Sequence, residues 1–182
     1  MLAVGNPDTS TSSPTGLLTI ENGNLWYYPG NGGGALNSPA ELGTGWNSMT
    51  LIAPGYEGPQ NQLVLWARDN TSGNLYSYQF SDDSGTWTLS TTGTAATITP
   101  EGSDATQITL PAGVPALTAA AYPAIASAGD ATGPAALYLL DANGNIWALT
   151  GNPNPTSAAD PLQGTLTQVA TTPSGTTVQQ LS

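Results

Sequence analysis

One pattern occurs three times along this chain of 182 residues, and it limits the fold more than any other feature. Each copy contains a short apolar run, a polar loop, a second apolar run, a Gly-Asn pair and a third apolar run. The pairs are Gly23-Asn24, Gly73-Asn74 and Gly144-Asn145. Because these residue types suit tight turns with positive φ, and the flanking runs are rich in Leu, Ile, Val, Trp and Tyr, each pair predicts a β-hairpin.

The spacing of the copies predicts the organisation of the chain. The Gly-Asn pair recurs after 50 residues, from Gly23 to Gly73, and then after 71, from Gly73 to Gly144. We expect one domain with units of about 1–50, 51–122 and 123–182, and we interpret residues 81–121 as an insertion in the second unit. A fourth strand per unit is expected at residues 40–42, 87–89 and 165–169. Fifteen prolines and 22 glycines oppose long helices.

Four short antiparallel strands in each unit describe one blade of a β-propeller, so the predicted fold is all-β with three blades. Known propellers close with roughly four to eight blades, so three blades leave an open arc with unpaired edges. Three solutions remain open. The chain is a segment of a longer protein, or two chains complete a ring, or the units form a compact barrel or sandwich.

Residues 23–80 carry a resemblance to a known family. The runs Gly23–Gly30, Leu42–Asn47, Leu51–Gly55 and Leu65–Asp69 resemble the FG-GAP/VCBS-type repeats of secreted actinobacterial proteins. The match is looser in the rest of the chain. The resemblance implies a propeller of the integrin-like kind.

Family repeats of this type usually carry a calcium loop rich in aspartate, and here the chain departs from the pattern. The equivalent stretches 5–8, 55–62 and 129–135 each retain at most one acid, of which Asp130 is the best placed. Calcium takes about six to eight oxygen ligands, several of them usually carboxylates. We therefore expect no metal site and no cofactor.

The charge balance excludes several partners. Twelve carboxylates and one strong cation, Arg68, give a net charge of -11. Binding to nucleic acid or to an anionic membrane needs clustered Lys and Arg, so neither is expected. The most apolar stretch, 114–128, is interrupted by Pro115 and Pro123 and is too short to span a bilayer. Cysteine is absent, which excludes disulfides.

The polar residues are mostly Ser, Thr, Asn, Gln and Gly, as in many exported bacterial proteins, so we expect an extracellular location. The first residues contain no signal peptide, since they have no basic region and no long apolar run. We expect that such a signal was removed or that the protein is not exported by this route.

The sequence lacks several side chains that enzymes commonly use for catalysis, and we expect that the protein is not an enzyme. Without His, Cys or Lys, the usual nucleophile–base triads are excluded. The adjacent acids Asp82 and Asp83 leave a carboxylate-based glycoside hydrolase as a remote alternative, but they lie in a turn-like sequence.

Aromatic residues near turns are the candidate binding residues. Trp46 and Trp87 lie in Gly-rich segments, and Trp66 lies close to Arg68. Rings beside Asn, Gln and Asp suit sugar binding, because a ring face stacks on the sugar while polar groups meet its hydroxyls. We expect ligand contacts at Trp46, Trp66, Arg68 and Trp87. The alternative for the tryptophans is core packing, and for Arg68 an ion pair with a carboxylate such as Asp69.

These features predict a non-catalytic secreted recognition module that binds carbohydrate or a cell-surface polymer. The main alternative is a structural module, which docks to copies of itself as a homo-oligomer or supports an attached enzyme.

Overall fold

The computed structural model describes residues 2–4, 16–57, 62–83, 86–89, 98–130 and 133–172. Within these ranges the protein is all-β, as predicted: regular structure consists of strands and one 3-10 turn, η1 (Trp46–Ser48). No helix in these ranges is long and apolar enough to cross a membrane.

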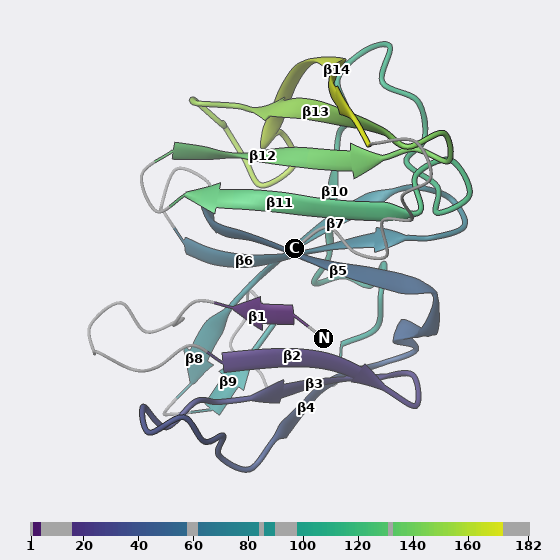
Figure 1. Ribbon diagram of the computed structural model, residues 1–182. Helices are drawn as coiled ribbons and strands as arrows, with labels where there is room; N and C mark the ends of the chain where they lie inside the picture. The colour runs from purple at the N-terminus through teal and green to yellow at the C-terminus, as the bar shows by residue number, and fades with distance from the viewer. Residues whose placement is uncertain are drawn as a thin grey trace.

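Three antiparallel sheets, each with four strands, follow one another along the chain (Figure 1). The first contains β1 (Leu2–Val4), β2 (Gly16–Glu21), β3 (Asn24–Tyr28) and β4 (Ala40–Thr44). The second contains β5 (Met49–Glu57), β6 (Gln62–Asp69), β7 (Leu75–Gln79) and β10 (Thr106–Ile108). The third contains β11 (Ala124–Asp130), β12 (Gly133–Leu140), β13 (Asn145–Gly151) and β14 (Leu162–Thr171). A small hairpin pairs β8 (Ser81–Asp83) with β9 (Thr86–Thr88).

The predicted Gly-Asn hairpins are confirmed in all three sheets. Gly23, Gly73 and Gly144 have φ values of 82°, 77° and 81°, and each lies between the second and third strands of its sheet. In the first hairpin Asn22 also has a positive φ of 52°. Two successive residues with positive φ match the right-handed twist of the flanking strands.

Two of the three expected fourth strands are confirmed and one is wrong. Residues 40–42 lie in β4 and residues 165–169 lie in β14. Trp87 instead belongs to the β8–β9 hairpin, and the fourth strand of the second sheet is β10, whose Ile108 is opposite Leu75. Ile108 is 2% exposed, so β10 brings an apolar side chain to the core at the sheet edge.

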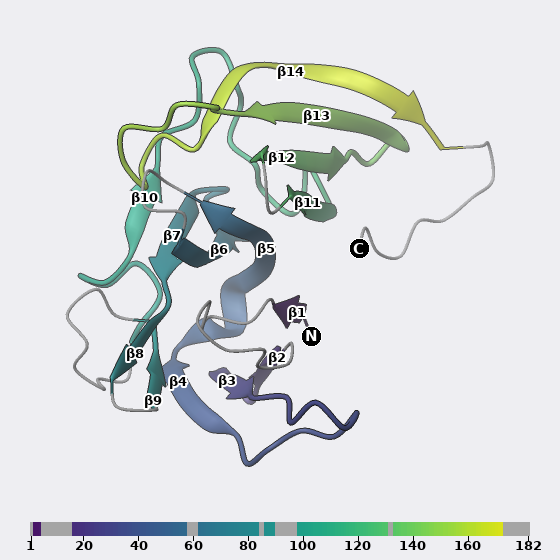
Figure 2. The same cartoon turned by 90° about the vertical axis from the view of Figure 1, so that its left-hand side faces the viewer.

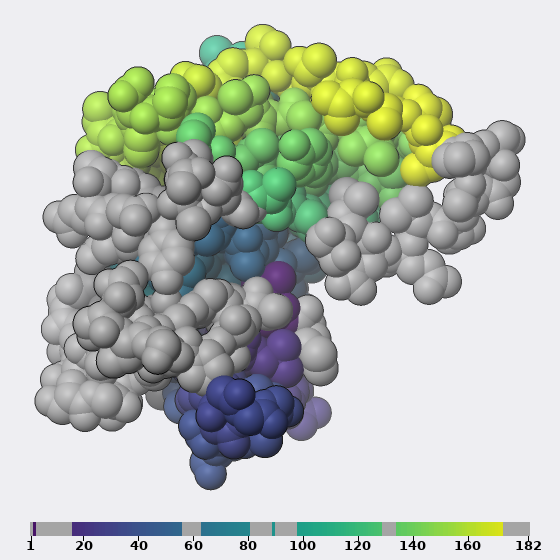
Figure 3. All heavy atoms as spheres, turned by 60° about the vertical axis from the view of Figure 1, so that its left-hand side comes forward, coloured from purple at the N-terminus to yellow at the C-terminus, as the bar shows by residue number. Residues whose placement is uncertain are grey.

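The three sheets are stacked face to face, with the second in the middle (Figures 1 and 2). Their first strands lie together, since β5 contacts both β1 and β11. The middle sheet is covered on both faces, and since side chains alternate along β6, this strand contributes to both cores. Leu63, Leu65 and Ala67 join the core shared with the first sheet, whereas Val64 and Trp66 join the core shared with the third. Figure 3 shows the first and third sheets at opposite ends of the molecule.

Part of the stretch 81–121 joins the first two sheets. The Ile98 amide donates to the Leu42 carbonyl at 3.0 Å, and the Thr44 amide donates to the Ile98 carbonyl at 3.0 Å. These bonds form a parallel bridge beside β4, after which the chain returns to the second sheet as β10. The described parts of this stretch therefore pack on the sheets, and the buried Leu89, Ile98, Ile108 and Leu117 belong to the two cores.

Candidate functional site

Trp46 lies in the core between the first and second sheets. Its side chain is 0% exposed, and its indole Nε1 donates to the Ile98 carbonyl at 3.4 Å. Its ring centroid lies 5.2 Å from that of Tyr78, at an interplanar angle of 50°. Burial of Tyr78 beside it raises the pKa of the phenol to about 12. Trp46 therefore has no exposed ring face for a sugar.

Trp66 occupies the equivalent core on the other side of the middle sheet. Its side chain is also 0% exposed and packs in the cluster shared with the third sheet. Its Nε1 has no hydrogen-bond acceptor among the described residues. The contribution of Trp66 is therefore apolar packing, and its ring offers no surface to a ligand from solvent.

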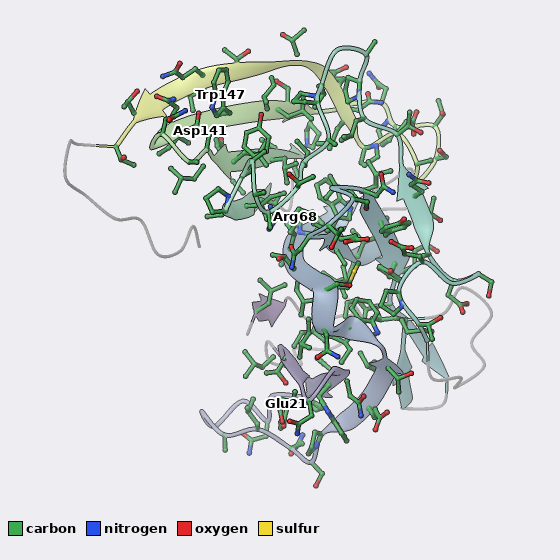
Figure 4. All side chains as sticks on the ribbon, turned by 90° about the vertical axis from the view of Figure 1, so that its right-hand side faces the viewer. Glu21, Arg68, Asp141 and Trp147 are labelled. Carbon is green, nitrogen blue, oxygen red and sulfur yellow. The ribbon has the colours of Figure 1, made fainter. Side chains whose placement is uncertain are left out.

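Arg68 lies between the second and third sheets and is 1% exposed (Figure 4). Its Nη1 donates to the Tyr122 carbonyl at 2.6 Å, its Nε to Asn70 Oδ1 at 3.1 Å and its Nη2 to Thr50 Oγ1 at 3.3 Å. All three acceptors are neutral, and burial lowers the pKa of the guanidinium. The side chain ties the segment before β11 to the middle sheet.

These positions correct the expected binding site. Trp46, Trp66 and Arg68 are core residues, so none of them presents a surface to a ligand. The expected ion pair with Asp69 is replaced by bonds to neutral groups, and the Asp69 carboxylate accepts hydrogen bonds from the amides of Thr71 and Ser72.

Several other predicted residues lie where the structure gives only the backbone. Asp82 is paired with Trp87 across the β8–β9 hairpin. The side chains of Trp87, Asp82, Asp83 and Asp130 are outside the described part of the protein. Among the described residues, no group of three or more acidic side chains is placed to hold a metal ion.

A carboxylate lies between the second strand of each sheet and the hairpin turn: Glu21 and Asp69 are the last residues of β2 and β6, and Asp141 directly follows β12. Asp141 is the most strongly bonded of the three, Glu21, Asp69 and Asp141. It accepts hydrogen bonds from the amides of Asn143 at 2.8 Å and Asn145 at 2.9 Å, and from Trp147 Nε1 at 3.0 Å (Figure 4). Desolvation raises the pKa of this carboxyl, but hydrogen bonds from Asn145 and Trp147 outweigh it and hold the pKa at about 2.

We expect Asp141→Asn to lower the melting temperature at neutral pH by about 2–4 °C, which corresponds to about 1 kcal/mol after allowance for solvent screening. The folded pKa of about 2 lies below the ordinary value of 3.8, so the carboxylate stabilises the fold above the ordinary pKa. This contribution is lost as the pH falls from about 4 to about 2. Melting curves at several pH values should show the two proteins converging in acid. A difference that persists at pH 2 would contradict the charge-based explanation, and Glu41→Gln, an exposed site, controls for the lost charge.

The packing between sheets uses the same two faces each time. We call the first of these the leading face. In each sheet it consists of four side chains from the second and third strands that are opposite one another and lie on the same side of the sheet. They are Leu17, Thr19, Trp26 and Tyr28 in the first sheet; Leu65, Ala67, Tyr76 and Tyr78 in the second; and Leu137, Leu139, Trp147 and Leu149 in the third.

The opposite side of each sheet is the trailing face. Its members are Leu18, Ile20, Leu25 and Tyr27 in the first sheet; Trp66, Arg68, Leu75 and Ser77 in the second; and Tyr138, Leu140, Ile146 and Ala148 in the third. The trailing face of the first sheet packs on the leading face of the second, and the trailing face of the second packs on the leading face of the third.

Two faces therefore lack a neighbouring sheet in the described structure: the leading face of the first sheet and the trailing face of the third. Six of their eight side chains are half-buried, and Thr19 and Leu140 are 7% and 5% exposed. Trp26 and Tyr28 are half-buried, whereas the equivalent Tyr76 and Tyr78 are 7% and 0% exposed. Tyr138, Ile146 and Ala148 are likewise half-buried. The sequence alone does not distinguish these faces from the covered ones, because Trp26 and Tyr28 occupy the same repeat positions as the buried Tyr76 and Tyr78.

The first leading face also carries a small polar network. Thr19 Oγ1 and the Tyr28 hydroxyl donate to Glu21 Oε1 at 2.6 Å and 2.9 Å. The hydrogen bonds from Thr19 and Tyr28 lower the pKa of Glu21, and the same carboxylate raises the pKa of Tyr28.

Comparison with known proteins adds no relative: the sequence matches no family model and no curated protein, and the fold matches no solved structure. The resemblance to FG-GAP/VCBS-type repeats therefore remains a prediction.

Proposed function

We propose that this chain is a non-catalytic, extracellular docking module built from three propeller-type blades, and that its two end faces bind further blades. The observation that carries the proposal is the repeated use of one pair of faces. Each internal contact joins a trailing face to a leading face, and one face of each kind is left at the ends of the stack. Apolar faces of this kind mark interaction surfaces in proteins.

The chemistry of the chain supports a binding role. The whole sequence contains no His, Cys or Lys, so the usual triads, in which a basic side chain activates a nucleophile, cannot form. The single arginine is buried and already hydrogen-bonded to three neutral groups. Trp46 and Trp66, two of the three tryptophans predicted to contact a ligand, are in the core, which favours docking of protein surfaces over binding at these two positions.

A tandem protein tests this proposal. Two copies of the chain are joined by a flexible Gly/Ser linker, which keeps the local concentration of each copy high for the other. If the end faces accept blades, the trailing face of the first copy packs on the leading face of the second. The tandem should then melt at least about 5 °C above the single chain at the same low concentration, because more apolar surface is buried.

The control is the same tandem carrying Trp26→Glu in both copies, which places a charge on each leading face. It should melt at the temperature of the single Trp26→Glu chain. If the unmodified tandem has the same melting temperature as the unmodified single chain, the docking proposal is overturned.

Carbohydrate recognition is the second candidate, and the first leading face favours it as well. Trp26 and Tyr28 offer half-exposed rings beside the carboxylate of Glu21, and sugars bind to such combinations of ring faces and polar groups. A glycan array probed with a multivalent form of the protein tests this candidate. Selective binding that is lost in Trp26→Ala and kept in Gln107→Ala, an exposed site on β10, would support it, and a blank array would remove it.

A further inference from the structure

We propose that the occupant of the end faces is a second copy of this chain, bound head to tail, so that two copies close into a ring of six sheets. This inference rests on the proposed docking function. In the ring, the trailing face of the third sheet of each copy packs on the leading face of the first sheet of its partner. Both contacts are then equivalent, and no end face is left uncovered.

The side chains at the two ends match those of an interface already present in the protein. Between the first and second sheets, a trailing face with one aromatic and three aliphatic positions meets a leading face with two aromatics and two small or aliphatic positions. The proposed contact has the same composition: Tyr138, Leu140, Ile146 and Ala148 meet Leu17, Thr19, Trp26 and Tyr28. The end faces therefore resemble the two halves of an interface that this sequence already forms.

The local charge also permits the contact. No member of the third trailing face is charged. Two acids border the first leading face. Glu21 is already bonded by Thr19 and Tyr28 within its own sheet, and Glu41, which is exposed and lies opposite Trp26 on β4, would meet the uncharged trailing face of the partner copy. Each copy nevertheless carries a net charge of -11, so the two copies repel one another at long range. Salt screens this repulsion, and association should therefore strengthen as the ionic strength rises.

The type of contact sets the form of the assembly. Because the two faces differ, the contact is heterologous, and heterologous contacts form a ring when the rotation between copies closes. Each copy contributes three sheets, so two copies give six, which is within the roughly four to eight blades of closed propellers. The ring also leaves no end sheet to recruit further copies.

Sedimentation velocity and native mass spectrometry test the ring. The chain has a mass of 18.4 kDa, and we expect a discrete species of twice that mass that becomes dominant as concentration and salt increase. Trp26→Glu on the leading face and Ile146→Glu on the trailing face should each weaken self-association at least about a hundredfold, because each buries an unpaired charge at both contacts. Gln107→Glu adds the same charge on the exposed edge of the middle sheet and should leave association unchanged.

Mixing the two variants gives the sharpest result. Trp26→Glu keeps its trailing face and Ile146→Glu keeps its leading face, so together they can form one intact contact. We expect an equimolar mixture to give a one-to-one heterodimer, although each variant alone stays monomeric. Ala148→Glu is a second trailing-face variant in case Ile146→Glu fails to fold, which circular dichroism will show.

Three results would overturn the inference. A monomer at every concentration and salt level excludes a second copy as the occupant. A variant that still dimerises alone indicates a symmetric contact between identical faces, and polymers without a size limit exclude the closed ring. The tandem protein separates this failure from that of the docking function: a stabilised tandem beside a strictly monomeric single chain would reject only the ring.

Discussion

Replacement of Trp46 by alanine should lower the free energy of unfolding by about 3–5 kcal/mol. The side chain is fully buried, its ring contacts that of Tyr78, and its Nε1 bonds to the Ile98 carbonyl. The variant loses the transfer energy of a large aromatic and leaves a cavity between the first two sheets. Since a domain is stabilised by only about 5–15 kcal/mol in total, a loss of this size is a large part of the stability.

Urea unfolding followed by circular dichroism measures this change. The matched control is Trp26→Ala, which removes the same residue type from the half-buried leading face and should cost about 1 kcal/mol or less in dilute solution. Equal losses for the two variants would contradict the assignment of Trp46 to the core and Trp26 to a surface.

Replacement of Arg68 by alanine has the second large expected effect, a loss of about 3 kcal/mol. The substitution removes the guanidinium donor from the buried Tyr122 carbonyl and from Thr50 Oγ1, whereas Asn70 Oδ1 still accepts from Thr50 Oγ1 at 2.7 Å. A buried acceptor without a partner carries a desolvation cost, and the missing side chain also leaves space between the second and third sheets. The contact that holds the segment before β11 to the middle sheet is lost with it.

Two further variants divide this effect into its causes. Arg68→Met refills the space without the charge, so we expect it to regain about 1 kcal/mol of the loss. Arg68→Lys keeps the charge but not the planar group that reaches three acceptors, so its stability should lie between those of the alanine variant and the original protein. If the free energy of unfolding of Arg68→Ala lies within about 0.5 kcal/mol of that of the original protein, the three hydrogen bonds only offset the cost of burying the guanidinium.

The local features of the fold could be predicted from sequence because their causes are local. Gly-Asn pairs between apolar runs predict hairpins, and each pair lies at a turn with positive φ at its glycine. The fourth strand of the second sheet was misplaced for a different reason. Both 87–89 and 106–108 are short runs that suit a strand, and only the contact with β7 distinguishes them.

The burial of the candidate site residues depends on distant contacts, which no local pattern contains. Trp46 is buried partly by Ile98, which lies 52 residues later in the chain. The backbone of Ile98 forms hydrogen bonds with β4 and with the indole of Trp46. For Trp66 a usable signal existed: the unbroken apolar run from Leu63 to Ala67 is typical of a strand covered on both faces. Arg68 directly follows this run, yet nothing in the sequence indicates that the only strong cation is buried against neutral acceptors.

The bridge between Ile98 and β4 also sets an order of events when the chain is made on a ribosome. The core between the first and second sheets includes Trp46, Leu89 and Ile98, so it is complete only after residue 98 has left the exit tunnel. Contacts that join residues far apart in sequence form late and slowly. Translation beyond the first sheet therefore leaves the core against its apolar trailing face incomplete from Thr44 until Ile98, and a pause in that interval would favour aggregation.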